Sequence, residues 1–251
     1  MSTPLAIPLT ASAPAFAPER VTYPDPVQPH GERASTPHPH LERARWLLVV
    51  RGEPLLKRAL DVLGAVALLS VAWPVLALAA LLVKLTDGGP VLFWQKRVGR
   101  DGRHFDFPKL RSMIVNAERA RPALEQENHH RGSVTFKMRR DPRVTWIGRI
   151  IRKLSIDELP QLWCVLGGDM SLVGPRPALP SEVRRYSCAD RRRLDVTPGL
   201  TCLWQVSGRG DLPFETQVRL DVDYILSRSF ALDLRILAAT VPAVLTGAGA
   251  Y

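Results

Sequence analysis

Two adjacent acids, Asp157 and Glu158, stand just before Pro160, a residue typical of the first turn of a helix. Acids at a helix N-terminus interact favourably with the helix dipole, and Ser155 and Glu158 have the spacing of a capping box, so a structural role would account for both. The pair also suits phosphoryl transfer, because one carboxylate can attack phosphorus and form an aspartyl phosphate. The other can hold Mg²⁺ together with substrate phosphates. The two acids alone leave both interpretations open.

The segment before the acid pair is strongly basic. Residues 131–153 carry eight cations and one acid, Asp141. Arginines of this kind would bind the non-reacting oxygens of a phosphate, and a metal ion would offset the repulsion between a carboxylate and a diphosphate. A nucleic-acid site could share this charge, but neither an aromatic stacking pattern nor helix-turn-helix spacing accompanies it. The pattern therefore favours phosphates or lipid headgroups over nucleic acid.

The whole chain shares this basic character. Its 251 residues include 34 Lys and Arg against 24 Asp and Glu, which gives a net charge of +10. A basic excess of this size indicates polyanionic partners. Hydrophobic residues make up 46% of the chain, enough for a sizeable core, and three cysteines without a C-x-x-C pair argue against a disulfide framework or a zinc site.

Three local elements are expected to position the acids and cations. Apolar residues recur at helical spacing over 146–154, with Thr145 as a suitable N-cap, and predict an amphipathic helix that lies on headgroups or faces phosphates. Apolar runs on both sides of the turn at 99–102 predict a short β-hairpin. The helix that starts at the acid pair should end at Gly167-Gly168. Residues 232–246 are expected to form a further helix, either a second interfacial helix or an ordinary solvated or core-packed one.

A membrane segment precedes these elements. Val62–Val83 is a run of 22 residues without a charge, long enough to cross a bilayer core of about 30 Å. Pro74 favours a kink in this helix, and five cations flank each side, so the positive-inside rule selects no orientation. The residues alone leave a spanning helix and a re-entrant hairpin equally open. In both cases the protein is expected to be bound to a membrane.

Residues 1–40 differ from the rest of the chain. They hold nine of the 22 prolines and show no sustained helical or strand periodicity, so we expect a disordered tail. A signal peptide does not fit, because no cationic segment opens the chain and prolines interrupt any apolar run.

The run from Arg152 to Pro177, RKLSIDELPQLWCVLGGDMSLVGPRP, resembles the core of the bacterial sugar transferases, the monotopic polyprenyl-phosphate phosphoglycosyl transferases. The resemblance covers about residues 55–245 in consistent order. Its further motifs are Lys57-Arg58-x-x-Asp61, Gln95-x-Arg97-x-Gly99, Lys109-Leu-Arg111-Ser-Met113, Asp141-Pro-Arg143-Val-Thr145, Pro198-Gly199-Leu-Thr201, Trp204-Gln205 and Asp221-x-x-Tyr224.

The resemblance implies a reaction and roles for the acids. Members transfer a sugar 1-phosphate from a UDP-sugar to undecaprenyl phosphate and release UMP, the first step in assembling exopolysaccharides or other glycans. Asp157 matches the nucleophile that forms the covalent phosphosugar intermediate, and Glu158 matches its Mg²⁺-associated partner, so both are candidate metal ligands. Arg152 and Arg176 match arginines at the phosphate site. The remaining motif residues expected to bind substrate or phosphate are Lys109, Arg111, Arg143, Gln95 and Arg97.

The family's membrane helix is re-entrant and broken at a proline, which matches Pro74. We therefore expect an α+β fold, mainly α: a membrane re-entrant helix-break-helix and a small cytosolic domain with interfacial helices and a short β-hairpin. The expected boundaries are a Pro-rich tail (1–40), a basic membrane-proximal helix (41–58), the re-entrant helix (59–85) and the cytosolic phosphoglycosyl transferase domain (86–251). Because no further apolar run of membrane-spanning length precedes residue 62 in this sequence, we expect the compact form of the family, without the extra N-terminal spans of its larger members.

The expected partners are a UDP-sugar, undecaprenyl phosphate and lipids at the cytosolic face of a bacterial inner membrane, and no nucleic acid. The sugar and a homo-oligomeric state are left open; the resemblance to exopolysaccharide-type members favours a hexose. Two alternatives remain. Asp221-x-Asp223 could belong to a conventional membrane-associated glycosyltransferase that releases UDP, or the chain could be a non-catalytic basic membrane adaptor.

Overall fold

The structure, a computed structural model, describes residues 55–120, 138 and 141–247. The expected tail, most of the expected basic helix and four of the eight cations in 131–153 lie outside these residues. Within them the fold is mainly helical, as predicted for an α+β chain that is mainly α.

A long helix and a β-hairpin, both described below, come first in the chain. The elements that follow them are η2 (Ala117–Ala120), α4 (Trp146–Lys153), η4 (Ile156–Gln161), α5 (Leu162–Gly167), β3 (Ser171–Val173), α6 (Pro180–Val183), η5 (Asp190–Asp195), β4 (Gly199–Thr201), α7 (Leu203–Ser207), η6 (Arg209–Asp211), α8 (Phe214–Ser227) and α9 (Phe230–Thr246).

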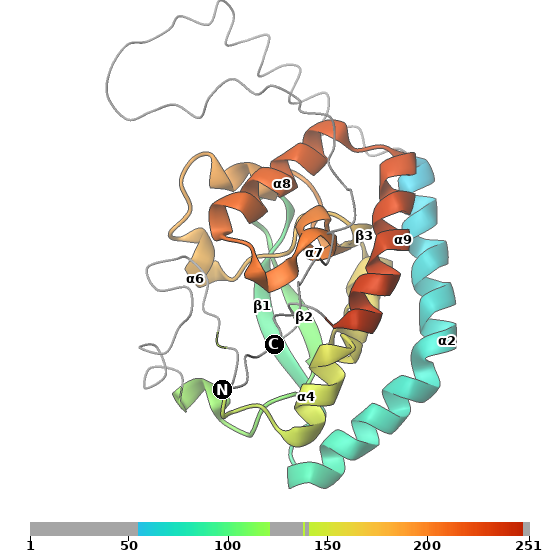
Figure 1. The fold of residues 1–251 in the computed structure, drawn as a ribbon, viewed down its shortest axis with the longest axis vertical. Helices are drawn as coiled ribbons and strands as arrows, with labels where there is room; N and C mark the ends of the chain where they lie inside the picture. The colour runs from blue at the N-terminus through green and yellow to red at the C-terminus, as the bar shows by residue number, and fades with distance from the viewer. Residues whose placement is uncertain (1–54, 121–137, 139–140, 248–251) are drawn as a thin grey trace, which may run out of the picture. The chain divides into compact units, whose positions relative to one another are not determined.

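The long helix α2 runs from Leu55 to Asp87 and contains Pro74. Its most apolar stretch has a mean hydropathy of 2.5 and is only 11% buried, so α2 is long and apolar enough to cross a membrane. The helix is continuous, which differs from the expected helix-break-helix, but its ribbon bends part-way along (Figure 1). A bend within an unbroken helix agrees with the loss of one backbone hydrogen bond at a proline. A re-entrant path through the bilayer stays a prediction.

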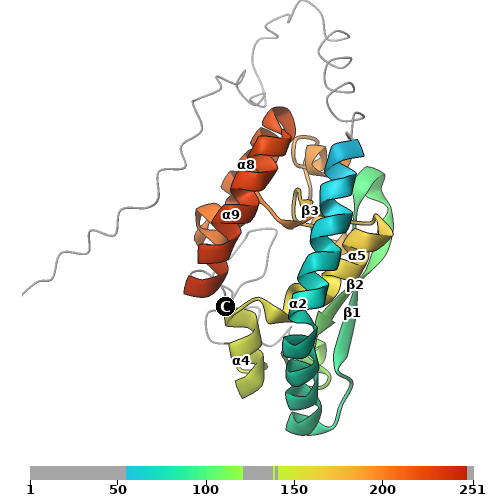
Figure 2. The same ribbon diagram turned by 90° about the vertical axis from the view of Figure 1, so that its right-hand side faces the viewer.

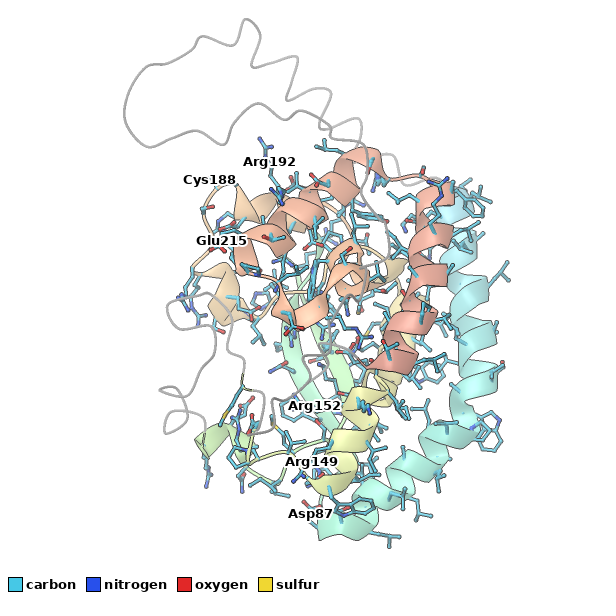
Figure 3. The ribbon with its side chains drawn as sticks, viewed as in Figure 1. Asp87, Arg149, Arg152, Cys188, Arg192 and Glu215 are labelled. Atoms are coloured by element: carbon cyan, nitrogen blue, oxygen red, sulfur yellow. The ribbon has the colours of Figure 1, made fainter. Side chains whose placement is uncertain are left out.

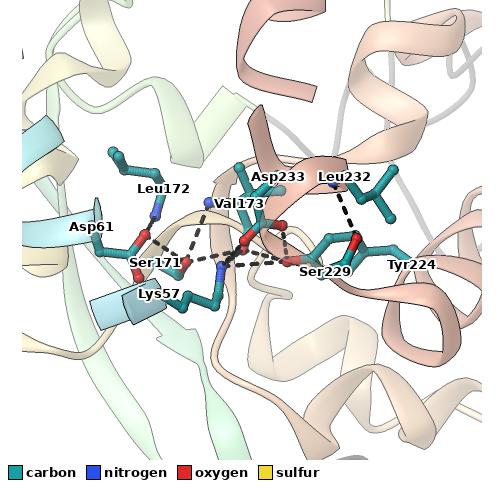
Figure 4. A network of polar contacts seen from close by, with 9 residues as sticks. All are labelled: Lys57, Asp61, Ser171, Leu172, Val173, Tyr224, Ser229, Leu232 and Asp233. Atoms are coloured by element: carbon teal, nitrogen blue, oxygen red, sulfur yellow. Dashed lines mark hydrogen bonds and ion pairs between the residues drawn. The ribbon is translucent and has the colours of Figure 1, made fainter. Parts of the chain in front are cut away.

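Buried polar contacts fasten the start of α2 to the domain (Figure 4). Lys57 Nζ donates to Asp233 Oδ2 at 2.8 Å and to the Val173 carbonyl at 3.0 Å. Tyr224 Oη donates to the other oxygen of Asp233 at 2.8 Å. One turn later, Asp61 Oδ1 accepts from the backbone N–H of Leu172 at 2.9 Å. These contacts join α2 to β3, α8 and α9, elements more than 100 residues away in the sequence.

The predicted hairpin is confirmed. Strands β1 (Leu92–Val98) and β2 (His104–Leu110) pair antiparallel, with Gln95 opposite Phe107. Alternate strand residues point to opposite faces, so Gln95 and Arg97 share one face of the hairpin with Phe107 and Lys109. In Figure 2, α9 lies on one side of α2, and α5 and the hairpin lie on the other. A second, parallel pair, β3 with β4, joins segments that the sequence did not predict as strands.

Helix α4 confirms the predicted amphipathic segment. The side chain of Thr145 accepts a hydrogen bond from the Gly148 N–H at 3.0 Å, so it caps the helix as predicted. Ile147 and Ile151 are buried in a cluster with the second half of α2, whereas Trp146 is 57% exposed. Helix α9 likewise confirms the predicted helix over 232–246. Contact of either helix with a membrane stays a prediction.

Gly148 permits the close approach of α4 to the preceding loop. A Cβ atom at this position would lie 1.9 Å from the backbone oxygen of Ser112. Gly148→Ala should therefore lower the free energy of unfolding by about 1–3 kcal/mol, because the backbone must move to relieve the clash. Thermal unfolding in detergent should show the loss. Gly167→Ala is the control, since its Cβ would approach no atom closer than 3.8 Å, and an equal loss in both variants would contradict this explanation.

Candidate active site

The acid pair lies on η4, a 3₁₀ turn that continues directly into α5. Ser155, just before it, adopts a left-handed conformation with φ of +55°, and its side chain makes no capping hydrogen bond. The capping-box interpretation is therefore wrong, because this backbone conformation does not present the hydroxyl to the helix N–H groups. The predicted stop is confirmed: α5 ends at Gly167, and Gly168 has a φ of +90°.

Glu158 is bound to two cations. Its Oε1 atom accepts from Arg176 Nη2 at 2.5 Å and from Lys109 Nζ at 3.3 Å, and its Oε2 atom accepts from Arg176 Nη1 at 3.3 Å. Burial alone would raise the pKa of Glu158, but Arg176 and Lys109 outweigh this effect and hold it well below its ordinary value. Glu158 is therefore a firmly ionised carboxylate.

Asp157 has a different environment from its neighbour. It is 6% exposed, and burial, with a smaller contribution from the charge of Glu158, raises the pKa of Asp157 to about 6. Lys109 and Arg152 act in the opposite direction. No residue in the described part of the chain hydrogen-bonds to the Asp157 carboxylate. Adjacent carboxyl groups with such different pKa values are characteristic of sites where two acids take different roles.

The β-hairpin contributes two cations, Arg97 and Lys109, to the surroundings of the acid pair. Arg97 donates to Gln95 Oε1 at 2.8 Å and to the Pro177 carbonyl at 3.1 Å. Its guanidinium group lies 5.0 Å from the centre of the Phe107 ring, and Lys109 Nζ lies 5.2 Å from the same centre. Burial, reinforced by nearby Arg176, lowers the pKa of Arg97 to about 10. Burial likewise lowers the pKa of Lys109 to about 8, although Glu158 opposes it.

The structure brings most of the predicted site residues together. Asp157, Glu158, Lys109, Arg176 and Arg97 form one cluster, with Gln95 orienting Arg97. Arg152, on α4, contributes charge near Asp157, and Figure 3 shows it together with Arg149 on that helix.

Two predicted phosphate-binding arginines are engaged elsewhere. Arg111 binds both carboxylate oxygens of Asp87, which lies at the end of α2 (Figure 3), and also the Pro90 carbonyl at 2.6 Å. Arg143 binds both carboxylate oxygens of Asp141, at 2.9 and 2.5 Å. These contacts fasten neighbouring chain segments to each other, and the structure does not bring either arginine into the cluster around Glu158. Phosphate binding by them stays a prediction.

One cation of the site was missed from the sequence. Arg209 is half-buried at the start of η6, with a φ of +50° between two glycines. Burial lowers the pKa of Arg209, and the charges of Glu158 and Arg176 act on this pKa in opposite directions, so Arg209 lies within electrostatic range of both. A Gly-Arg-Gly loop is a weak signal, and only the folded chain brings it to the acid pair.

Asp221 of the Asp221-x-Asp223 pair is inside the protein. It is 1% exposed, and its carboxylate lies 2.6 Å from the Arg193 guanidinium. Burial raises the pKa of Asp221 to about 6, although Arg193 opposes it. A metal ion that arrives with a nucleotide needs a carboxylate that solvent can reach, and Asp221 is buried against Arg193. The structure therefore does not support this pair as the site of a conventional glycosyltransferase.

The two acids by themselves offer few ligands for a metal ion. Within the described residues, no group of three or more His, Cys, Asp or Glu side chains gathers. Mg²⁺ is commonly held by one or two carboxylates together with substrate phosphates. Asp157, which accepts no hydrogen bond from a described residue, could supply one such ligand and a bound diphosphate most of the others. Glu158 could add a ligand through a lone pair that Arg176 and Lys109 leave unused.

Comparison with known proteins agrees with this chemistry. The family described as bacterial sugar transferase matches residues 52–247. The chain is 40% identical over 198 residues to the exopolysaccharide production protein ExoY of Sinorhizobium fredii, covering 78% of this chain and 88% of that protein. It is 41% identical over 208 residues to the undecaprenyl-phosphate galactose phosphotransferase of Salmonella typhimurium, covering 81% of this chain and 43% of the relative.

A third relative carries a different sugar in its name. The UDP-glucose:undecaprenyl-phosphate glucose-1-phosphate transferase of Caulobacter vibrioides is 43% identical over 205 residues, covering 78% of this chain and 72% of that protein. The chain spans less than half the length of several curated relatives that it matches.

Proposed function

Because the chain belongs to the bacterial sugar transferase family, we propose that it transfers a sugar 1-phosphate from a UDP-sugar to undecaprenyl phosphate at a membrane surface. The observation that carries this proposal is the pair of adjacent acids in unlike environments: Glu158 is bound to cations, whereas Asp157 has no hydrogen-bond partner among the described residues. The names of the Salmonella and Caulobacter relatives describe the same class of transfer.

In the proposed first step, a carboxylate oxygen of Asp157 attacks the phosphorus that carries the sugar. The bond from this phosphorus to the UMP oxygen breaks, UMP leaves with the electron pair, and the phosphosugar is joined to Asp157. In the second step a phosphate oxygen of undecaprenyl phosphate attacks the same phosphorus and releases the Asp157 carboxylate. Glu158 is a poor candidate for the attack because both of its oxygens already accept hydrogen bonds from cations.

The cations around the acids would stabilise the negative charge of the reacting phosphates. Arg176, Lys109 and Arg97 meet beside Glu158, and charge-assisted hydrogen bonds from such groups are stronger than neutral ones. Glu158 keeps Arg176 and Lys109 in place before the substrate arrives, so little reorganisation is required during the reaction.

Mg²⁺ would be held by Glu158 and Asp157 with the diphosphate of the donor. Bound there, it would supply positive charge that reduces the repulsion between the anionic nucleophile and the diphosphate.

The apolar outer face of α2 supports membrane attachment. Leu63, Val71 and Trp73 are 70%, 80% and 64% exposed, which is unfavourable for a helix in water. We propose that α2 enters the cytosolic leaflet of a bacterial inner membrane and returns at the bend, so that the acid pair meets a lipid phosphate at headgroup level. The sugar is proposed to be a hexose, because the relatives named above include galactose and glucose enzymes.

The released nucleotide tests this function. Protein in nanodiscs should be incubated with undecaprenyl phosphate and a panel of UDP-sugars, and both UMP and UDP should be measured. UMP release with formation of a lipid-linked sugar diphosphate is expected for at least one donor. Release of UDP would identify a conventional glycosyltransferase, and binding to vesicles without any turnover would favour the adaptor alternative.

Arg209 is expected to bind a donor phosphate. Arg209→Ala should raise the KM for the UDP-sugar by about 10- to 100-fold, because a hydrogen bond to a charged group contributes about 1.5–3 kcal/mol. Steady-state UMP release at varied donor concentration measures this effect. Arg103→Ala, at an exposed arginine of the hairpin turn, is the control. Equal KM values in the two variants would remove Arg209 from the donor site.

A further inference from the structure

An apolar groove of about 490 Å³ lies between α2, the hairpin and α5. Its walls include Ala77 and Ala80 of α2, Trp94 and Pro108 of the hairpin, Pro160 of η4 and Trp163 of α5. The volume falls in the range of small-molecule sites, about 300–1,000 Å³. Apart from Asp169, every residue that lines the groove is uncharged, so its chemistry favours a hydrocarbon.

The groove belongs to the surface that carries the apolar helix. One wall is formed by Leu76, Ala77 and Ala80 of the apolar helix α2, and the two tryptophans that line the groove, Trp94 and Trp163, are 58% and 64% exposed. Tryptophan is enriched where proteins meet the membrane interface, because its ring is apolar and its N–H is polar. A ligand of this groove would therefore arrive from the lipid phase.

The groove and the acid pair share two elements. Pro160 lines the groove and lies two residues after Glu158 in the same 3₁₀ turn. On β2, Pro108 and Leu110 line the groove, whereas Lys109 between them binds Glu158. On β2, the groove therefore lies on one face of the strand and Lys109 on the other face, and Lys109 is the direct sequence neighbour of both groove residues.

We propose that this groove binds the isoprenoid chain of the lipid phosphate acceptor while its phosphate binds the cations around Glu158. An acceptor of this kind is an anion attached to a long hydrocarbon, which matches a cationic cluster beside an apolar groove. The chain would pass the edge of β2 before it enters the groove, so isoprene units beyond the first few would make the contact. This inference rests on the proposed function.

The test fills the groove without touching the acids. Ala77 is exposed and lines the groove, so Ala77→Phe should occupy it; Leu78→Phe, next to it on α2 and outside the groove lining, is the matched control. In nanodiscs, Ala77→Phe should raise the KM for undecaprenyl phosphate at least tenfold, and Leu78→Phe should leave it within twofold. UMP release from donor alone reports whether each variant is folded and competent for the first step.

A second pair of variants removes groove contacts instead of filling the groove. Trp163 lines it and Trp73 does not, although both are 64% exposed. Trp163→Ala should raise the acceptor KM at least threefold and Trp73→Ala should not, and this pair decides the question if Ala77→Phe fails to fold.

Unchanged acceptor KM values in both groove variants would assign the groove to bilayer acyl chains and overturn the inference. Equal increases in the controls would also overturn it, because the effect would then be one of membrane insertion. Failure of the proposed function would be seen separately, as wild-type protein that releases no UMP from any donor.

Discussion

Replacing Asp157 with asparagine is expected to lower sugar 1-phosphate transfer at least about a thousandfold, because an amide of the same shape cannot attack phosphorus. Glu158 cannot substitute, since Arg176 and Lys109 already bind its oxygens. Formation of the lipid-linked product from a labelled UDP-sugar measures the loss. Unchanged thermal unfolding would show that Asp157→Asn keeps the fold.

Asp106→Asn is the matched control for this loss. Asp106 is on the hairpin in an exposed pair with Lys96, 2.8 Å away, so removing its charge should leave transfer within about twofold. Activity within tenfold of wild type in Asp157→Asn would place the nucleophile elsewhere or indicate direct transfer to the acceptor.

The second large effect concerns stability. Lys57 and Asp233 are 10% and 3% exposed, and removing one member of such a buried pair leaves an uncompensated charge. Lys57→Met should therefore lower the free energy of unfolding by about 3–5 kcal/mol. For a domain of this size the melting temperature should fall by about 10 °C, measured in detergent. The start of α2 would lose its direct contact with α8 and α9, whereas Asp61 would still hold it to β3 through the Leu172 N–H.

Two further variants test this explanation. The double change Lys57→Met/Asp233→Leu should recover most of the stability, because a buried ion pair can be replaced by apolar side chains of similar volume. Lys96→Met, in the exposed pair with Asp106, should cost less than about 1 kcal/mol. A double variant less stable than Lys57→Met would show that the charge of Asp233 does not cause the loss.

Elements with a strong local signal could be predicted from the sequence. Thr145 before an amphipathic run marks α4, apolar runs around a glycine turn mark the hairpin, and Gly168 marks the end of α5. Strands β3 and β4 have three residues each, too few for a periodic pattern, and they pair only because distant segments meet. Ser155 shows the limit of local rules: its spacing fits a cap, but its left-handed backbone prevents one.

Most residues of the site could be named from the sequence, but their contacts could not. Of the basic segment 131–153, the structure places Arg152 near Asp157, whereas the two cations that bind Glu158, Lys109 and Arg176, come from the family motifs. Sequence could not show that Arg111 and Arg143 bind Asp87 and Asp141 instead, because each pairing depends on how neighbouring loops fold.

Donor-only incubation tests the central claim most directly. Protein mixed with a UDP-sugar and no acceptor should release about one UMP per active site, and peptide mass spectrometry should find the phosphosugar on Asp157. Undecaprenyl phosphate added afterwards should remove the adduct and yield the lipid-linked product. UMP release only when the acceptor is present, with no modified Asp157 at any time, would contradict the covalent account.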